Sequence, residues 1–170
     1  MNVADLLARR SIRKYTDEPI RADQLQAALE AAMAAPSAMH CDPWRFIVIE
    51  SQADRDRLAD ALPFGQMLRH APMGIIVCGD LNVAHRNQLS YLLQDVSAAI
   101  QNLLLALHAQ GLGAVWLGIH PNDDRVAAVK ASFEIPDHVI PVSAIALGHP
   151  AEHPEARNRF NANHVHYGKW

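Results

Sequence analysis

Four cationic side chains and one hydroxyl lie close together near the start of the chain. They belong to the segment Arg9-Arg10-Ser11-Ile12-Arg13-Lys14-Tyr15. Guanidinium groups match the oxygens of a phosphate in bidentate geometry, and a serine adds one neutral donor. Acidic residues flank the segment at Asp5, Asp17 and Glu18, so the positive charge is a local cluster and not part of a basic domain. The segment indicates either a site for the phosphate of a small cofactor or a solvated helix end, where cations are also favoured.

A second pair of cations, Arg157 and Arg159, lies near the other end of the chain. Glycine-rich phosphate loops are absent: there is no Walker A sequence, and Gly111, Gly113 and Gly118 have the wrong spacing for G-x-G-x-x-G. A bound phosphate would therefore depend on the two arginine clusters. Their convergence on one phosphate would be a specific arrangement, which requires the two ends of the chain to meet.

The chain offers no convincing nucleophile. Cys41 lies between His40 and Asp42, which suggests a Cys–His pair. Neighbouring residues of an extended segment point in opposite directions, so His40 is badly placed to activate the thiol. No G-x-S-x-G sequence is present either. We therefore expect neither a catalytic thiol nor a catalytic serine.

Ten histidines raise the question of a metal site. Two pairs have spacings that could chelate a metal, His149 with His153 and His164 with His166. No second cysteine or acidic partner falls at a zinc-like interval from them. We therefore expect these histidines to be surface residues, with no bound metal.

Length and composition exclude several classes of protein. At 170 residues the chain is long enough for one core, and we expect a single domain over 1–170. Half of the residues are apolar, and the net charge of -3 argues against nucleic-acid binding. We expect no membrane span and no signal peptide, because no apolar run approaches about 20 residues and the start lacks a basic-then-apolar pattern. Two isolated cysteines, Cys41 and Cys78, fit a reducing cytoplasm.

Several elements must position the cationic segment. A short helix from Val3, which Asn2 could cap, places the arginines at its C-terminal end. The two prolines in 35–44 predict an extended loop, and Pro141 predicts an edge position or a bulge in the last strand. The order of elements predicts an α+β fold with a small mixed sheet between helix layers. The apolar patterns predict further helices at 22–33, 52–62, 88–110 and 123–133, and strands at 45–50, 72–79, 114–118 and 139–147.

The predicted helix over 88–110 is apolar nearly all round and contains no glycine or proline. Such a helix is buried nearly all round, either by a second subunit or as the central helix of one protomer. The tail over 148–170 is polar and has no core of its own, so it must cover another surface to be ordered. The main apolar stripe of the helix comprises Leu89, Leu92, Leu93, Val96, Ile100, Leu103, Leu104 and Leu107.

Six segments, in the right order over almost the whole chain, resemble the nitroreductase family of FMN-dependent oxidoreductases. Residues 9–15 are similar to the family's R-R-S-x-R-x-[YF] opening, and 35–39 with 43–46 to its A-P-S and P-W-x-F loop. Residues 71–77 are similar to its second strand, and 94–106 to its long interface helix. Residues 111–118 are similar to the strand beside the flavin, and 159–170 to its closing segment.

The resemblance implies an α+β sandwich that forms an intertwined homodimer, with FMN at the interface. It implies that the opening segment and the tail hold the phosphate and ribityl chain, through Arg9, Arg10, Ser11, Arg13, Arg157 and Arg159. A loop from the partner subunit would line the ring and ribityl, through Pro36, Ser37, Ala38 and Met39, with His40 close to the cofactor. The strand beside the flavin would present its backbone near N5 at Leu117, Gly118 and Ile119.

The chemistry implied by the resemblance belongs to the flavin, so no catalytic residue is expected from the protein. NAD(P)H would deliver hydride to N5, and an electron-poor acceptor such as a nitroaromatic or quinone would then take it in a ping-pong scheme. The alternative is a non-catalytic FMN-binding or flavin-sensing protein. The family usually has amides where this chain has His40, Cys41 and Asp42. We hypothesise that Asp42 either faces away from the ring or lowers the flavin potential.

Overall fold

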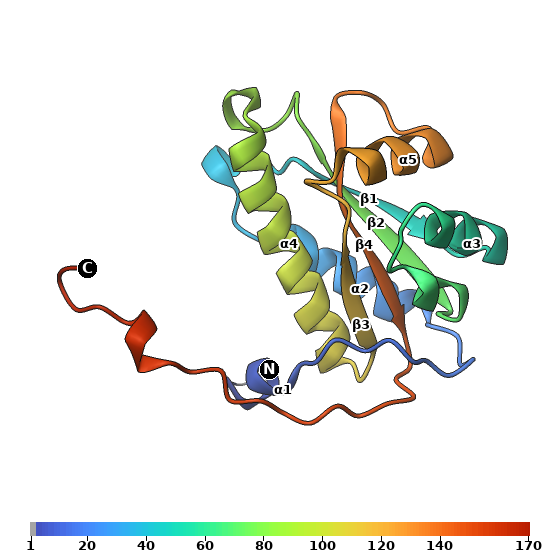
Figure 1. The fold of residues 1–170 in the computed structure, drawn as a ribbon, viewed down its shortest axis with the longest axis horizontal. Helices are drawn as coiled ribbons and strands as arrows, with labels where there is room; N and C mark the ends of the chain where they lie inside the picture. Colours follow the sequence, from blue (N-terminus) through green and yellow to red (C-terminus); the bar gives the residue numbers. More distant parts are fainter. Residues whose placement is uncertain (1–2) are drawn as a thin grey trace.

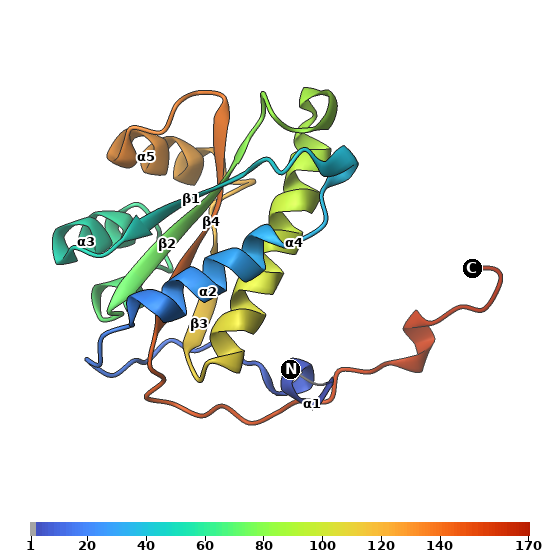
Figure 2. The same ribbon diagram turned by 180° about the vertical axis from the view of Figure 1, so that it is seen from behind.

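A four-stranded sheet with helices on both faces forms the body of the protein. The structure is a computed structural model that describes residues 3–170. Helices α2 and α4 pack on one face of the sheet, and α3 and α5 on the other (Figures 1 and 2). The α+β class and the helix layers are therefore confirmed. The elements are α1 Val3–Ala8, α2 Ala22–Met33, β1 Trp44–Ile49, α3 Gln52–Asp60, β2 Met73–Asp80, α4 Leu89–Ala109, β3 Gly113–Gly118, α5 Asp123–Phe133 and β4 Val139–Gly148.

The strand order is β1-β2-β4-β3, and all three pairings are antiparallel. The four strands are therefore antiparallel and not mixed as the sequence predicted, although an isolated parallel bridge joins Ser11 to Ala114 beside the sheet. Strand β4 is internal, so the predicted edge position for Pro141 is wrong and the predicted bulge is right. Val77 pairs with Ser143, whereas Cys78 pairs with Pro141, which leaves Val142 as the extra residue. A bulge places the proline in an internal strand at a point where the ladder is already interrupted.

The sheet separates two apolar cores because side chains alternate along its central strands. On β2, Ile75 and Val77 pack with α2 and α4, whereas Ile76 and Cys78 face α3 and α5. All four side chains are fully buried. This arrangement explains why β2 is almost continuously apolar in sequence, since both of its faces are covered.

The two thiols are expected to differ in reactivity. Burial raises the pKa of Cys78 to about 12, whereas Cys41 is half-buried in the 35–44 loop. Because the thiolate is the reactive form, Cys78 stays protonated and inert at neutral pH. We expect a thiol reagent at pH 8 to modify one cysteine of the native protein and both after unfolding. Two rapidly reacting thiols in the folded protein, counted by mass spectrometry, would contradict this packing.

The cationic segment follows α1 and runs beside β3. Ile12 donates its backbone N–H to the carbonyl of Ala114 at 3.0 Å. The Tyr15 hydroxyl lies 2.5 Å from the Ile12 carbonyl and 3.0 Å from that of Ala146. Gly113 permits this close approach, because a Cβ there would lie 2.8 Å from the Cβ of Ile12. The segment is therefore fixed to the sheet. The proposed Asn2 cap lies outside the described residues.

The long helix and the tail remain partly uncovered in a single chain. The inner side of α4 is buried, but Leu89 is exposed and Leu93 is half-buried. Figures 1 and 2 show α4 at the outside of the body and the last residues of the tail extending away from it. Tyr167 and Trp170 of the tail are fully exposed. In the described residues, α4 is therefore not a central helix that one protomer covers on all sides. Over residues 3–170, no helix is both long and apolar enough to cross a membrane.

Candidate functional site

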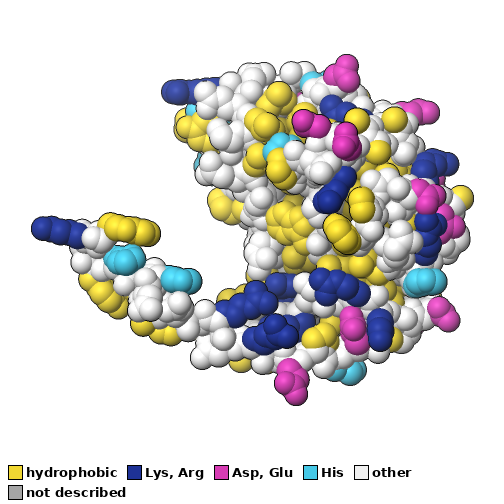
Figure 3. Space-filling view, viewed as in Figure 1, with side chains coloured by type: hydrophobic (Ala, Val, Ile, Leu, Met, Phe, Trp, Pro, Cys, Tyr) yellow, Lys and Arg dark blue, Asp and Glu magenta, His cyan; other side chains and the backbone are white. Residues whose placement is uncertain are grey.

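The two arginine clusters meet at one cavity. Its volume is about 720 Å³, and the space-filling view shows Lys and Arg side chains gathered where the tail leaves the body (Figure 3). Backbone bonds hold the tail against the opening segment, since Ala151 donates to the Lys14 carbonyl at 2.9 Å. The structure therefore brings together five of the predicted site residues. The lining comprises Leu6, Leu7, Arg9, Arg10, Ser11, Ala156, Arg157, Asn158, Arg159 and Phe160.

The positive charges in this cavity repel one another. Burial, followed by the nearby guanidinium groups of Arg10 and Arg159, lowers the pKa of Arg9. An anion between these guanidinium groups would therefore relieve their mutual repulsion.

Arg10 differs from Arg9 in its partners. Its Nε donates to the Glu155 carbonyl at 2.9 Å, and its Nη1 donates to the carbonyls of Leu7 and Arg9 at 2.8 and 2.6 Å. Its Nη2 is buried and has no hydrogen-bond partner among residues 3–170. The Arg10 guanidinium thus joins the opening segment to the tail and keeps one donor free.

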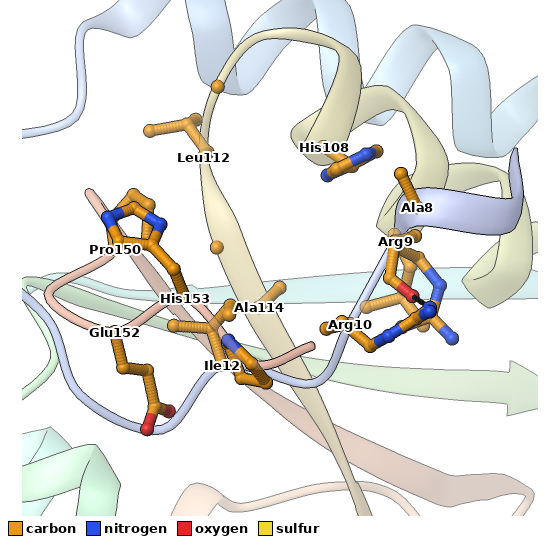
Figure 4. Close-up of a pocket in the computed structure, with 14 residues that line it drawn as sticks. Ala8, Arg9, Arg10, Ile12, His108, Leu112, Ala114, Pro150, Glu152 and His153 are labelled. Atoms are coloured by element: carbon orange, nitrogen blue, oxygen red, sulfur yellow. Dashed lines mark hydrogen bonds between the residues drawn. The ribbon is translucent and has the colours of Figure 1, made fainter. Parts of the chain in front are cut away.

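Glu152 of the tail bonds to the backbone of the opening segment. Figure 4 shows Glu152 and His153 on one side of a second cavity, of about 230 Å³, with Arg9 and Arg10 on the other side. The Glu152 carboxylate accepts from the backbone N–H groups of Arg13 and Lys14, at 2.5 and 3.2 Å. It therefore fixes the path of the segment and does not neutralise Arg9.

The prolines of the 35–44 loop predict an extended segment, but the loop is extended only in part. Residues Ala38–His40 form a 3-10 turn, and Met39, His40 and Asp42 have φ of 54°, 55° and 49°. Hydrogen bonds inside the loop override the local preference for extended backbone. The Ser37 hydroxyl donates to Asp42 Oδ1 at 2.5 Å, and the Asp42 N–H donates back to Ser37 Oγ at 3.1 Å. The Asp42 carboxylate is thus hydrogen-bonded to the Ser37 side chain. Met39, between them in the chain, is 76% exposed.

A buried acid on α4 holds this loop in place. Asp95 Oδ1 accepts from the Ala38 N–H at 2.9 Å, and its Oδ2 is buried with no partner among residues 3–170. Sequence reasoning missed this role, although a lone acid within the apolar stripe of the helix was a visible signal. The free oxygen is a second acceptor that the loop does not use.

Removing this acceptor should free the loop. We expect Asp95→Ala to lower the free energy of unfolding by about 1–3 kcal/mol, because the partly buried Ala38 N–H loses its partner. Asp95→Asn keeps an acceptor oxygen and should lose less. Denaturant unfolding measures the stability, and limited proteolysis at 36–42 measures loop opening. Equal proteolysis of the Ala and Asn variants would show that the hydrogen bond does not hold the loop.

The end of β3 supplies the third group of predicted residues. Leu117 and Ile119 are buried, and the Ile119 N–H donates to the Val142 carbonyl at 3.2 Å. Gly118 is exposed, and apart from Gly118 and its two chain neighbours no heavy atom of the described residues lies within 4 Å of the position that a Cβ would take. Arg13, which does not line the arginine cavity, lines a smaller cavity with Leu117 and Gly118. A planar ligand can therefore approach the backbone closely at Gly118.

The loop and the arginine cavity lie at opposite ends of α4. Asp95 holds the loop near the start of the helix, whereas His108, near its end, shares a cavity with Arg9. These two positions are separated by about 20 Å, given the rise of 1.5 Å per residue. Figures 1 and 2 show the loop near one end of α4 and the opening segment near the other end. One chain therefore does not bring the predicted loop residues, Pro36 to His40, to the predicted phosphate residues.

The histidine pairs do not form a metal centre in the structure. Over residues 3–170, no group of three His, Cys, Asp or Glu side chains is placed to hold a metal ion. His149 instead lies 3.6 Å from the Glu18 carboxylate, and His164 lies 3.2 Å from the Asn161 amide.

Comparisons with known proteins match most of the chain. The family model described as the nitroreductase family matches residues 6–63 and 61–149. A candidate NADH dehydrogenase/NAD(P)H nitroreductase of Methanothermobacter thermautotrophicus is 44% identical over 162 residues, which cover 95% of this chain and 84% of the relative.

Solved structures are similar over nearly the full length. A candidate NADH dehydrogenase/NAD(P)H nitroreductase from Parabacteroides distasonis has a TM-score of 0.92 and 36% identity, covering 99% of this chain and 98% of that one. A candidate nitroreductase from Desulfovibrio desulfuricans, solved with FMN, has a TM-score of 0.85 and 32% identity, covering 99% and 96%.

Proposed function

The chain belongs to the nitroreductase family, and from this premise we propose that it is an FMN-dependent oxidoreductase that uses NAD(P)H. Its acceptor is an electron-poor small molecule such as a nitroaromatic or a quinone. The observation that carries the proposal is the cavity at which arginines from both ends of the chain meet and repel one another. The two free thiols fit a reducing, cytoplasmic setting.

The residues of this cavity suit the phosphate of FMN. Arg9 is partly desolvated beside Arg159, and Arg10 keeps a buried N–H without a partner. A phosphate dianion would neutralise the first two groups and accept from all three. Ser11 adds a neutral donor from the same segment. Arg157, which lines the same cavity, supplies a further cation at the rim.

The protein's own part in the reaction is to bind, orient and exclude water. When bound, FMN supplies the redox chemistry, accepting hydride from NAD(P)H and passing it to the acceptor in a second, separate half-reaction. The arginines bind the phosphate end of the cofactor, so the position of the flavin ring is fixed through the ribityl chain. Gly118 leaves its backbone open to the ring. No side chain has to act as a nucleophile.

A second copy of the chain completes the site. Asp95, which holds the loop, and His108, which shares a cavity with Arg9, are about 20 Å apart along the α4 axis, so the loop and the arginines of one chain lie at opposite ends of this helix. The uncovered outer side of α4 and the extended tail offer surfaces for a partner. We propose a homodimer in which each FMN meets the arginines of one chain and the loop of the other.

Steady-state kinetics on the purified protein test this function. We expect a yellow protein that oxidises NAD(P)H in the presence of a nitroaromatic acceptor and gives parallel lines in double-reciprocal plots. A protein that binds FMN and shows no turnover with nitroaromatics or quinones would be a flavin sensor instead. A colourless protein that does not take up FMN would end the proposal.

A further inference from the structure

The tail and the opening segment pair along a short antiparallel stretch. Thr16 donates its N–H to the His149 carbonyl, and Ala151 donates to the Lys14 carbonyl, both at 2.9 Å. An isolated antiparallel bridge lies between these two bonds. The pairing ends at Ala151, whereas the tail residues that line the arginine cavity begin at Ala156. Other contacts must therefore direct the tail toward the cavity.

Glu152 continues the contact past the end of this pairing. Its Oε1 accepts from two successive N–H groups of the opening segment, those of Arg13 at 2.5 Å and Lys14 at 3.2 Å. Hydrogen bonds to an ionised acceptor are roughly twice as strong as bonds between neutral groups. Glu152 is half-buried, which strengthens such bonds further. One side chain of the tail thus holds the backbone of the opening segment where the pairing stops.

Tyr15 joins the same segment to the sheet. Its hydroxyl lies within hydrogen-bonding distance of the Ile12 and Ala146 carbonyls, at 2.5 and 3.0 Å. Burial, followed by the Glu152 carboxylate, raises the pKa of Tyr15, so the hydroxyl keeps its proton and remains a donor. The segment is therefore fixed to the sheet through Tyr15 and to the tail through Glu152.

The cavity arginines oppose the contact between the tail and the segment. Burial, followed by the guanidinium groups of Arg10 and Arg159, lowers the pKa of Arg9. Like charges from both stretches therefore lie near one another, and before an anion binds their repulsion favours separation. The Arg10 bond to the Glu155 carbonyl and the two bonds of Glu152 offset this repulsion.

The charge of Glu152 and its hydrogen bonds have opposite effects on a bound anion. Glu152 lines the cavity of about 230 Å³, on the other side from Arg9 and Arg10 (Figure 4). A carboxylate in this place repels a phosphate, so its charge alone would weaken cofactor binding. Its hydrogen bonds would strengthen binding, because they hold the tail beside the segment. The sign of the effect therefore separates the two roles.

We propose that Glu152 is a positioning residue for FMN, which keeps the tail on the opening segment so that Arg9 and Arg159 reach the same phosphate. The inference rests on the proposed oxidoreductase function and adds to it a residue that does not touch the cofactor. A preformed site binds more tightly, because the tail does not have to be ordered at the moment of binding. Glu152 should therefore determine how strongly the protein prefers FMN to riboflavin, which lacks the phosphate.

The test titrates apo protein with FMN and with riboflavin and compares the two dissociation constants. Glu152→Ala should lower the preference for FMN at least about tenfold, because both charge-assisted bonds are lost. Glu152→Gln keeps an acceptor oxygen and should retain most of the preference. Glu152→Asp keeps the charge on a shorter side chain, so it should lose part of the preference.

The matched control removes a carboxylate from the same tail. Glu155 is exposed, and its side chain makes no hydrogen bond or ion pair among residues 3–170, since only its carbonyl accepts from Arg10. Glu155→Ala should leave the preference for FMN within about twofold, because exposed charges are screened by salt. An equal loss of preference in Glu155→Ala and Glu152→Ala would overturn the inference.

The order of the variants distinguishes positioning from charge. Positioning places the wild type and Glu152→Gln above Glu152→Asp and Glu152→Ala in preference for FMN. If charge decided the preference, the Gln and Ala variants would exceed the wild type, which would overturn the inference. The Gln and Asp variants are sufficient for this comparison if the Ala variant does not fold. A wild type that binds both flavins equally would overturn the phosphate site and the inference together, whereas a preference retained by every Glu152 variant would overturn the inference alone.

Discussion

Replacing both Arg9 and Arg159 with glutamine should lower the affinity for FMN by about two to four orders of magnitude. Each charge-assisted hydrogen bond contributes about 1.5–3 kcal/mol, and the two together correspond to this range. The substitutions should not damage the core, because Arg159 is exposed and Arg9 is only half-buried. They also remove the mutual repulsion that, after burial, lowers the pKa of Arg9, so the apo protein should not be destabilised. Titration of apo protein with FMN, followed by flavin fluorescence, measures the change.

The control for this double variant removes the same two charges elsewhere. Arg21 is exposed and pairs with Asp23, and Arg57 lies over Phe133. Arg21→Gln combined with Arg57→Gln should leave FMN affinity within about twofold, because exposed charges beyond a Debye length of about 10 Å are screened. An equal loss of affinity in both double variants would mean that the arginine cavity is not the phosphate site.

Mixing two defective variants should restore activity if each site uses both chains. The first is the Arg9→Gln, Arg159→Gln variant, and the second is Met39→Asp, which places a carboxylate on the proposed ring face of the loop. Met39 is exposed in the single chain and adopts φ of 54°, a conformation that aspartate tolerates. Random exchange makes half of the dimers mixed, each with one intact site, so activity should reach about a quarter of the wild type.

The same mixing experiment has a clear opposite outcome. If each site were built from one chain alone, a mixed dimer would hold one site of each defect and no intact site. Activity after unfolding, mixing and refolding would then stay at the average of the two variants. A protein that sediments as a monomer when loaded with FMN would also exclude the shared site.

The sequence predicted the elements well because their apolar patterns are strong. Most of the stripe from Leu92 to Leu107 is buried, with Leu93 half-buried, and the apolar run of β2 is buried as well. The meeting of the opening segment with the tail was only a requirement of the phosphate hypothesis. It depends on bonds between distant residues, such as Arg10 to Glu155, that no local pattern encodes.

The loop shows where local rules failed. Its prolines favour extended backbone, yet the bonds of Ser37 with Asp42 and of Ala38 with Asp95 produce a turn with three left-handed residues. Asp95 lies 57 residues away from Ala38 in the chain, so this contact is set by the fold.

The comparison of FMN with riboflavin tests the central claim most directly. The two flavins differ only by the phosphate that the arginines of both chain ends are proposed to bind. Titrating apo protein with each, we expect FMN to bind at least about a hundredfold more tightly, at one flavin per chain, in keeping with two charge-assisted hydrogen bonds. Equal affinity for FMN and riboflavin would contradict the account, because the guanidinium groups would then contribute nothing to holding the cofactor.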